Sequence, residues 1–299
     1  MFAMHRNRLK KNGRIRSLIQ LGFAAFLNGY ARGFWKGQIF TGQTKGVCVP
    51  VLNCYSCPGA LGACPVGAMQ AALGDKKKPF PFYVLGTLML FGVLFGRLLC
   101  GFVCPFGFLQ DILHKIPVPK IRLPQRVDRI LRGMKYVLLL LFVVLLPLMA
   151  VDRYGISTPW FCKYICPAGT LEGGVFLAIP DSRLRGLLGA LFTWKFGVLL
   201  FVIVGAMTIP RFFCRYFCPL GAFYALFNRF SFYQMTYNHE KCVDCGKCES
   251  VCPMEVNPIK ELDGFECIRC GKCKDICPSG AIENGIMFTK EGKDKIFDK

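Results

Sequence analysis

The sequence predicts a mainly α-helical protein: an integral membrane bundle of about four spans, followed by a small α+β domain at the C-terminus. Three observations predict this class. Hydrophobic residues make up 53% of the 299 positions, and 28 of them are phenylalanines, a bias that favours a membrane protein. Apolar stretches without charged residues recur before residue 211. The more polar C-terminal segment carries eight of the 18 cysteines in two regular runs.

Four apolar stretches are expected to cross the membrane. Each is shorter than the roughly 20 residues that usually span a bilayer. Basic residues flank them, and Trp35, Trp160 and Trp194 lie near their ends, as aromatic residues do at membrane interfaces. Buried helices of a soluble protein are the alternative. The expected spans are residues 17–31, 80–96, 136–151 and 196–210.

The distribution of basic residues predicts the orientation. The basic leader, residues 1–16, lacks a small-residue cleavage site, so the first span is expected to stay as an anchor. The positive-inside rule then places residues 1–16, 97–135 and 211–299 in the cytoplasm. Lys76–Lys78 would lie outside, against the rule. The expected location is the cytoplasmic membrane, crossed several times, with the N-terminus and the C-terminal domain inside.

The C-terminal cysteines form two runs of the pattern C-x2-C-x2-C-x3-C-P. This is the bacterial ferredoxin spacing, in which the fourth cysteine of each run ligates the cluster of the other run. A zinc site would need two well-separated pairs instead. Residues 230–299 are therefore expected to form a 2[4Fe–4S] ferredoxin domain after a transmembrane domain of residues 1–229, with 230–240 as the linker. The expected ligands are Cys242, Cys245, Cys248 and Cys277 for one cluster and Cys252, Cys267, Cys270 and Cys273 for the other.

A short motif, C-P-x-G followed by another residue and an apolar one, occurs five times. The copies begin at Cys64, Cys104, Cys166, Cys218 and Cys277. Proline suits the first turn of a helix, where its missing N–H costs nothing. Each cysteine is thus expected at a helix N-terminus, whose partial positive charge favours an anionic cluster.

Three copies are preceded by a cysteine four residues earlier, and such a pair supplies only two of the four ligands that a cubane needs. Two pairs must therefore meet. Cys100/Cys104 and Cys214/Cys218 follow the second and fourth expected spans, so together they predict one cluster at the inner face. Both pairs lie at the same offset from their spans, which indicates an internal repeat.

The third pair is expected on the outer side with the cysteine-rich loop of residues 32–79. These six cysteines exceed the needs of one cluster. In the preferred arrangement, the two cysteines of the pair and two thiols of the loop hold one cluster. In the other arrangement, four thiols of the loop hold the cluster alone. The two remaining thiols would be shared ligands of the cluster or would form a disulfide. For Cys48, the alternative is a buried cysteine that only packs in the core. The candidates are Cys162 and Cys166 of the pair and Cys48, Cys54, Cys57 and Cys64 of the loop.

The C-x3-C-P pairs after apolar spans, followed by a ferredoxin tail, resemble the NapH-type membrane ferredoxins and the related NosR- and CcoG-type proteins. The resemblance covers roughly residues 80–280. It implies four to six spans, cubane clusters, and electron transfer between the quinone pool or a cytoplasmic donor and a partner redox protein. The chain departs from the pattern in its third pair and its Cys48–Cys64 loop, and no threonine-anchored flavin domain of the NosR kind is apparent.

Other chemistry finds little support in the sequence. Only three histidines occur, none in an expected span and none in a C-x-x-C-H motif, which excludes c-type and bis-histidine haem. Phosphate-binding and dinucleotide-binding motifs are missing. The net charge is +20, and the basic residues that produce it lie beside apolar runs. This placement predicts membrane lipids rather than nucleic acid as the partner. Asp152, Glu172 and Asp181 are expected as solvated residues, with proton relay as the alternative.

The predicted function is to relay single electrons across the cytoplasmic membrane through about four [4Fe–4S] clusters. The chain would act as a subunit of a redox complex rather than as a stand-alone enzyme, between a ferredoxin- or flavoprotein-like cytoplasmic donor, or a quinol, and a partner redox protein. A quinone or flavin that completes the path is left open. The alternative is a maturation factor that reduces a client's metal or flavin centre, with Cys54 and Cys57 as redox thiols. Lys241, Lys247, Lys272 and Lys274 are expected to steer an acidic donor.

Overall fold

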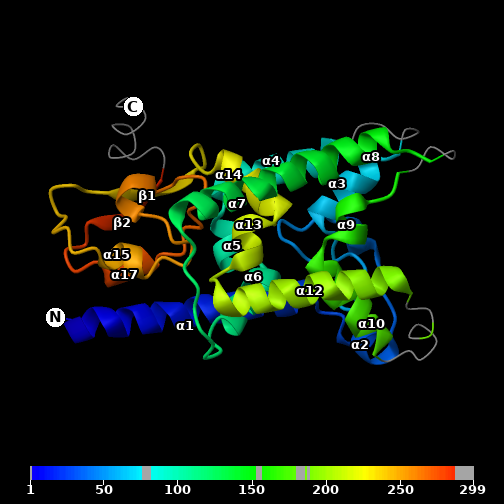
Figure 1. The fold of residues 1–299 in the computed structure, drawn as a ribbon, viewed down its shortest axis with the longest axis horizontal. Coiled ribbons are helices and arrows are strands. Elements are labelled where there is room, and N and C mark those ends of the chain that lie inside the picture. The colour runs from blue at the N-terminus through cyan, green and yellow to red at the C-terminus, as the bar shows by residue number, and fades with distance from the viewer. Residues whose placement is uncertain (1, 76–81, 153–156, 180–185, 187–188, 287–299) are drawn as a thin grey trace.

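The computed structural model describes residues 2–75, 82–152, 157–179, 186 and 189–286, and these are mostly helical. Figure 1 shows an elongated body with the C-terminal domain at one end and helices α2, α3, α8 and α10 at the other. The helices of the first half are α1 (Phe2–Leu27), α2 (Ala31–Lys36), the 3₁₀ turn η1 (Gln43–Gly46), α3 (Pro65–Leu73), α4 (Phe82–Phe95), α5 (Leu98–Phe102) and α6 (Pro105–Leu113).

Helix α1 joins the basic leader and the first apolar stretch in one continuous element. It runs beside the C-terminal domain and then along α6 (Figure 1), and Asn12 Nδ2 donates to Asp275 Oδ1 at 2.6 Å. The apolar part ends at Leu27, four residues before the expected end of the first span. The leader thus packs against the C-terminal domain.

The second half repeats an alternation of long and short helices. Two π-helical segments occur, each inside a longer helical run, where such segments often mark functional sites. The elements are α7 (Gln125–Val137), η2 (Leu138–Leu145), α8 (Leu146–Met149), α9 (Trp160–Tyr164), η3 (Gly169–Val175), α10 (Phe176–Ala178), α12 (Ala190–Thr208), α13 (Phe212–Tyr216) and α14 (Pro219–Phe227).

Two helices within the described residues are long and apolar enough to cross a membrane, Gln125–Met149 and Ala190–Thr208. Only 22% and 17% of their most apolar windows are buried, unlike the core helix of a soluble protein. Helix α4 is equally apolar but has 14 residues. Two of the four expected spans thus have a counterpart of sufficient length, and the four-span bundle stays a prediction.

The C-terminal domain combines a two-stranded antiparallel sheet with short helices. Strand β1 (Tyr233–Tyr237) pairs with β2 (Ile282–Ile286), with Tyr237 opposite Ile282. The expected linker, 230–240, is therefore partly a strand: residues 233–237 form one of the two strands of the domain that follows. The helices are α15 (Lys247–Ser250), α16 (Pro258–Glu261) and α17 (Lys272–Ile276).

The described residues form three buried clusters, and the largest of them joins all three regions of the molecule. It contains cysteines of the loop, of the C-x3-C-P pairs and of the C-terminal domain, together with apolar side chains from all three regions. Cys64, Cys100 and Cys218 belong to it, as do Met254 and Ile268 of the C-terminal domain. The cysteine groups are therefore separated by packed protein interior.

Candidate iron–sulfur sites

The C-terminal domain contains two small cavities, and each is lined by one of the expected sets of four cysteines. Gly246 and Gly271 follow the second cysteine of each run with φ of 66° and 77°, in the left-handed region that favours glycine. The chain thereby turns the next cysteine, at the start of α15 or α17, back toward the first two. One cavity is lined by Cys242, Cys245, Cys248 and Cys277, the other by Cys252, Cys267, Cys270 and Cys273.

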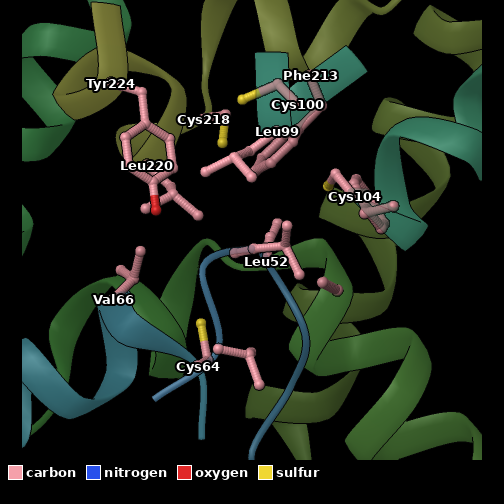
Figure 2. Packing of buried hydrophobic residues seen from close by; sticks show 14 of the residues in the cluster. Leu52, Cys64, Val66, Leu99, Cys100, Cys104, Phe213, Cys218, Leu220 and Tyr224 are labelled. Atoms are coloured by element: carbon pink, nitrogen blue, oxygen red, sulfur yellow. The ribbon is translucent and has the colours of Figure 1, made fainter. Parts of the chain in front are cut away.

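The two inner pairs are presented by matching structures. Cys100 lies in α5 and Cys214 in α13, and each short helix breaks before the next one begins. Cys104 and Cys218 are the N-caps of α6 and α14, and their Sγ atoms accept from Gly107 N at 3.4 Å and Gly221 N at 3.3 Å. Backbone N–H groups at these helix starts thus point to thiols, as an anionic cluster requires. Figure 2 shows Cys100, Cys104 and Cys218 on one side of the core.

The outer pair meets two of the four loop thiols. A Cβ atom added to Gly169 would lie 3.7 Å from the Sγ atoms of both Cys166 and Cys54. Burial, together with the neighbouring thiols of Cys162, Cys54 and Cys64, raises the pKa of Cys166 well above its ordinary value. Cys54 and Cys64 are therefore the loop thiols that converge with the pair, and Cys64 is the N-cap of α3.

The architecture fits a cubane better than a single metal ion. No three His, Cys, Asp or Glu side chains of the described residues converge closely enough for one ion. A four-iron cluster binds one thiolate on each iron, so its ligands stand further apart than those of zinc. At the outer site the glycines of two C-P-x-G motifs border this space: a Cβ on Gly67 would lie 3.8 Å from Cys162 Sγ, and one on Gly169 would lie 3.7 Å from Cys166 Sγ.

Comparison with known proteins gives the same result. A 4Fe–4S binding domain family matches residues 62–82, 79–124, 136–185 and 190–233, more than half of the chain, and two further 4Fe–4S binding domain families match 234–257 and 262–283. The fourfold match supports the internal repeat. An uncharacterised protein of Methanocaldococcus jannaschii, MJ0750, is 33% identical over 61% of the chain and 69% of its own length.

Two further relatives have names that refer to a pathway or a role. The methylamine utilization ferredoxin-type protein MauN of Paracoccus denitrificans is 28% identical over 77% of the chain and 71% of its length. The regulatory protein NosR of Stutzerimonas stutzeri is 29% identical over 54% of the chain and 21% of its length. The chain belongs to the NosR- and NapH-type polyferredoxin family. No solved structure matches this polyferredoxin.

Two arginines at the inner site were missed by the sequence analysis. Arg97 Nη2 donates to Cys214 O at 3.4 Å, and Arg211 Nη1 donates to Cys100 O at 2.6 Å, so each reaches across to the other pair. Both side chains are fully buried. The signal in the polyferredoxin sequence is an arginine three residues before the first cysteine of both inner pairs, and the outer pair has Pro159 there.

Two glutamines complete the repeat. Gln110 Nε2 donates to Cys214 Sγ at 3.0 Å while its Oε1 accepts from Phe213 N. Gln70 Nε2 likewise donates to Cys162 Sγ at 3.3 Å while its Oε1 accepts from Phe161 N. Each glutamine stands six residues after a C-P cysteine, at Cys104 and Cys64, a signal that was available in the sequence. The inner and outer sites are thus built by the same local rule.

Two expectations for single residues are corrected. Glu172 was expected to be solvated, but it is buried, and its Oε2 accepts from Cys54 N at 2.6 Å because η3 packs onto the cysteine loop. Burial raises its pKa to about 7. Cys277 does not start a helix: the chain turns at Gly280, with φ of 66°, into β2. Asp152 is exposed as expected, and Asp181 lies outside the described residues.

Two loop cysteines are left over. Cys57 is 1% exposed, with Sγ 3.4 Å from Asn28 Oδ1, and Cys48 is 5% exposed beside Cys64. All 18 cysteines lie in the described part of the chain, and all are free thiols.

Proposed function

We propose that the chain relays single electrons across the cytoplasmic membrane, from a cytoplasmic donor or quinol to a partner redox protein. The chain is an iron–sulfur electron-transfer protein by family; the route, the membrane and the partners are the proposal. The observation that carries it is the order along the molecule of the elements that hold the three cysteine groups: the C-terminal domain, then α5 and α13 with the inner pairs, then α3 and α9 at the outer site (Figure 1). When bound, each [4Fe–4S] cluster supplies reversible one-electron storage.

The C-terminal domain is held close against the inner pairs. A Cβ on Gly101, next to Cys100, would lie 2.7 Å from Ile268 O and 4.0 Å from the Cα of Cys270. Asn228, at the end of α14, donates to Gly264 O at 2.7 Å and to Cys267 O at 2.9 Å. The hydrogen bonds hold the 264–270 segment of the ferredoxin domain at the end of α14, and the close approach at Gly101 places it beside α5.

Packed side chains also fill the gap between the inner and outer sites. Figure 2 shows Leu52 and Val66 between Cys100 and Cys218 on one side and Cys64 on the other, with Tyr224 beside Cys218. Tyr224 is fully buried, and its hydroxyl donates to Pro50 O at 2.9 Å, which ties α14 to the cysteine loop. A rigid, dry medium keeps the distance between the sites constant.

The fixed charges around the two sites differ. Two buried guanidinium groups, Arg97 and Arg211, accompany the inner pairs, whereas a buried carboxyl group, Glu172, lies beside the outer site. Positive charge favours the reduced form of an anionic cluster, so Arg97 and Arg211 favour electron transfer from the ferredoxin domain to the inner site. The maturation-factor alternative needs Cys54 and Cys57 together as redox thiols; Cys54 is partly exposed, but Cys57 is buried, so the pair is less favoured as a site for a client.

The decisive experiment measures iron and acid-labile sulfide in anaerobically purified protein in detergent. About sixteen irons per chain supports four clusters in series, and about eight would leave only the ferredoxin pair and end the proposal. Cys104→Ser should remove about four irons. Proteoliposomes that contain the wild-type chain should then pass electrons from an external reductant to an enclosed acceptor, and the Cys104→Ser chain should not.

A further inference from the structure

A large cavity lies where helix α1, helix α6, the following loop and the ferredoxin domain meet. Its volume is about 1270 Å³, and it borders Cys252 of the ferredoxin domain. Eight basic and four acidic side chains line it. The basic side chains on its α1 wall are Lys10, Arg14 and Arg16, and those on the opposite walls include Arg122, Arg215 and Lys272.

The acidic side chains of the wall are engaged by protein groups. Asp111 pairs with Arg16 and Arg211, and Asp128 pairs with Arg132 and Arg215. Glu255 also pairs with Arg215, and Glu249 accepts a hydrogen bond from Asn257. Because the basic side chains of the wall outnumber the acidic ones, the wall carries a net positive charge, which attracts an anion into the cavity.

Two buried guanidinium groups of the wall have unused donors. Arg16 is 6% exposed; one nitrogen pairs with Asp111 at 2.9 Å, while Nε and Nη1 have no hydrogen-bond partner among the described residues. Arg215 is 1% exposed, and its Nε is without a partner in the same part of the chain. Buried donors without acceptors are costly, and arginine nitrogens are well matched to the oxygens of a phosphate group.

We infer that this cavity binds a phosphate monoester or diester among its basic side chains, which include Arg14 and Arg16 of α1. Leu18, Leu21, Phe108 and Ile121 line the cavity beside the basic groups, so the ligand has room for an apolar body next to its phosphate. Two kinds of ligand have such a phosphate group: an anionic lipid, through its headgroup, and a free phosphorylated molecule. The site does not depend on electron transfer by the chain.

The test measures binding of inorganic phosphate to the purified holoprotein by equilibrium dialysis. About one phosphate per chain should bind saturably. The Arg14→Gln variant and the Arg14→Gln, Arg16→Gln variant should weaken binding about tenfold or more, because a charge-assisted bond is worth roughly 1.5–3 kcal/mol. Arg14 is exposed, so its substitution tests the site even where loss of the Arg16–Asp111 pair disturbs folding.

Lys11→Gln is the matched control, because Lys11 lies exposed on the same helix outside the cavity wall. Binding that does not saturate, or that falls equally in Lys11→Gln, overturns the proposal. Competition identifies the source: displacement by a short-chain phosphatidylglycerol alone assigns a lipid headgroup, and displacement by a nucleoside monophosphate alone assigns a free phosphorylated ligand. Iron content, measured in the same samples, reports separately on the proposed relay.

Discussion

At the scale of single residues, the inner site depends on buried charges that are paired on the side away from the cysteines. Arg211 contacts Asp111 through Nε at 3.0 Å and Nη2 at 2.6 Å, and Arg97 contacts Glu266 at 3.1 Å. A buried charge is tolerated when it has a partner and is strongly destabilising when the partner is removed. The carboxylates therefore hold the two guanidinium groups in place beside the cysteines.

Asp111→Asn should lower the free energy of unfolding by about 2 kcal/mol at neutral pH. Burial alone would raise the pKa of Asp111, but Arg211 and Arg16 outweigh it and lower the pKa to about 2. Because the pKa is depressed in the folded state, the contribution is complete above pH 4 and disappears as the pH falls toward 2. Urea unfolding in detergent at pH 6 and pH 8 should give the same loss at both, and exposed Asp152→Asn should give none.

The four loop cysteines are predicted to differ in their effect on iron content. Cys54→Ser and Cys64→Ser should each remove about four irons per chain, since both thiols converge with Cys162 and Cys166. Cys57→Ser and Cys48→Ser should retain the full content. Iron analysis of the four variants checks this assignment; loss in Cys57→Ser with retention in Cys54→Ser would reverse it.

At the scale of elements, the repeated unit is a short helix, a break, and a second helix capped by a cysteine. The break turns the chain so that both cysteines of a pair face the same site, and the proline after the second cysteine starts the next helix. Helices α3, α6 and α14 all begin in this way, at Pro65, Pro105 and Pro219. The glutamines of α3 and α6 then tie each unit to the pair that faces it.

Gly101 allows a close approach between α5 and the ferredoxin domain. Gly101→Ala should push the 264–270 segment away from α5, because the new methyl group would lie only 2.7 Å from the backbone carbonyl oxygen of Ile268. Iron content should be unchanged, and rapid-reaction spectroscopy should show slower electron transfer from the ferredoxin clusters to the inner one. Gly133→Ala, which would meet nothing within 4 Å, is the control. Equal rates in both variants would contradict the proposed contact.

At the scale of the whole molecule, the elements that carry the cysteine groups follow one another along the long axis, and two long apolar helices flank them (Figure 1). The outward faces of these helices carry large apolar residues such as Leu140, Leu200 and Phe201. Exposed apolar surface of this kind favours contact with lipid. The relay would then lie within the bilayer or at its inner face.

Two exposed valines test the membrane position. Val204, 59% exposed on α12, should not tolerate arginine, because a charge within a span costs up to about 3 kcal/mol. Val243, 63% exposed in the ferredoxin domain, should tolerate Val243→Arg. The amount of protein in carbonate-washed membranes measures the effect. Equal recovery of both variants would argue for a soluble position of α12.

The sequence by itself determined the chemistry of this protein. Cysteine spacing predicted which four side chains line each ferredoxin cavity, and the C-P-x-G motif predicted the helix starts at Cys64, Cys104 and Cys218, because both depend on a few neighbouring residues. Only the tertiary structure decided which loop thiols meet Cys162 and Cys166, that Glu172 is buried, and that Arg97 and Arg211 cross between the inner pairs. These contacts join residues far apart in the chain, so no local pattern encodes them.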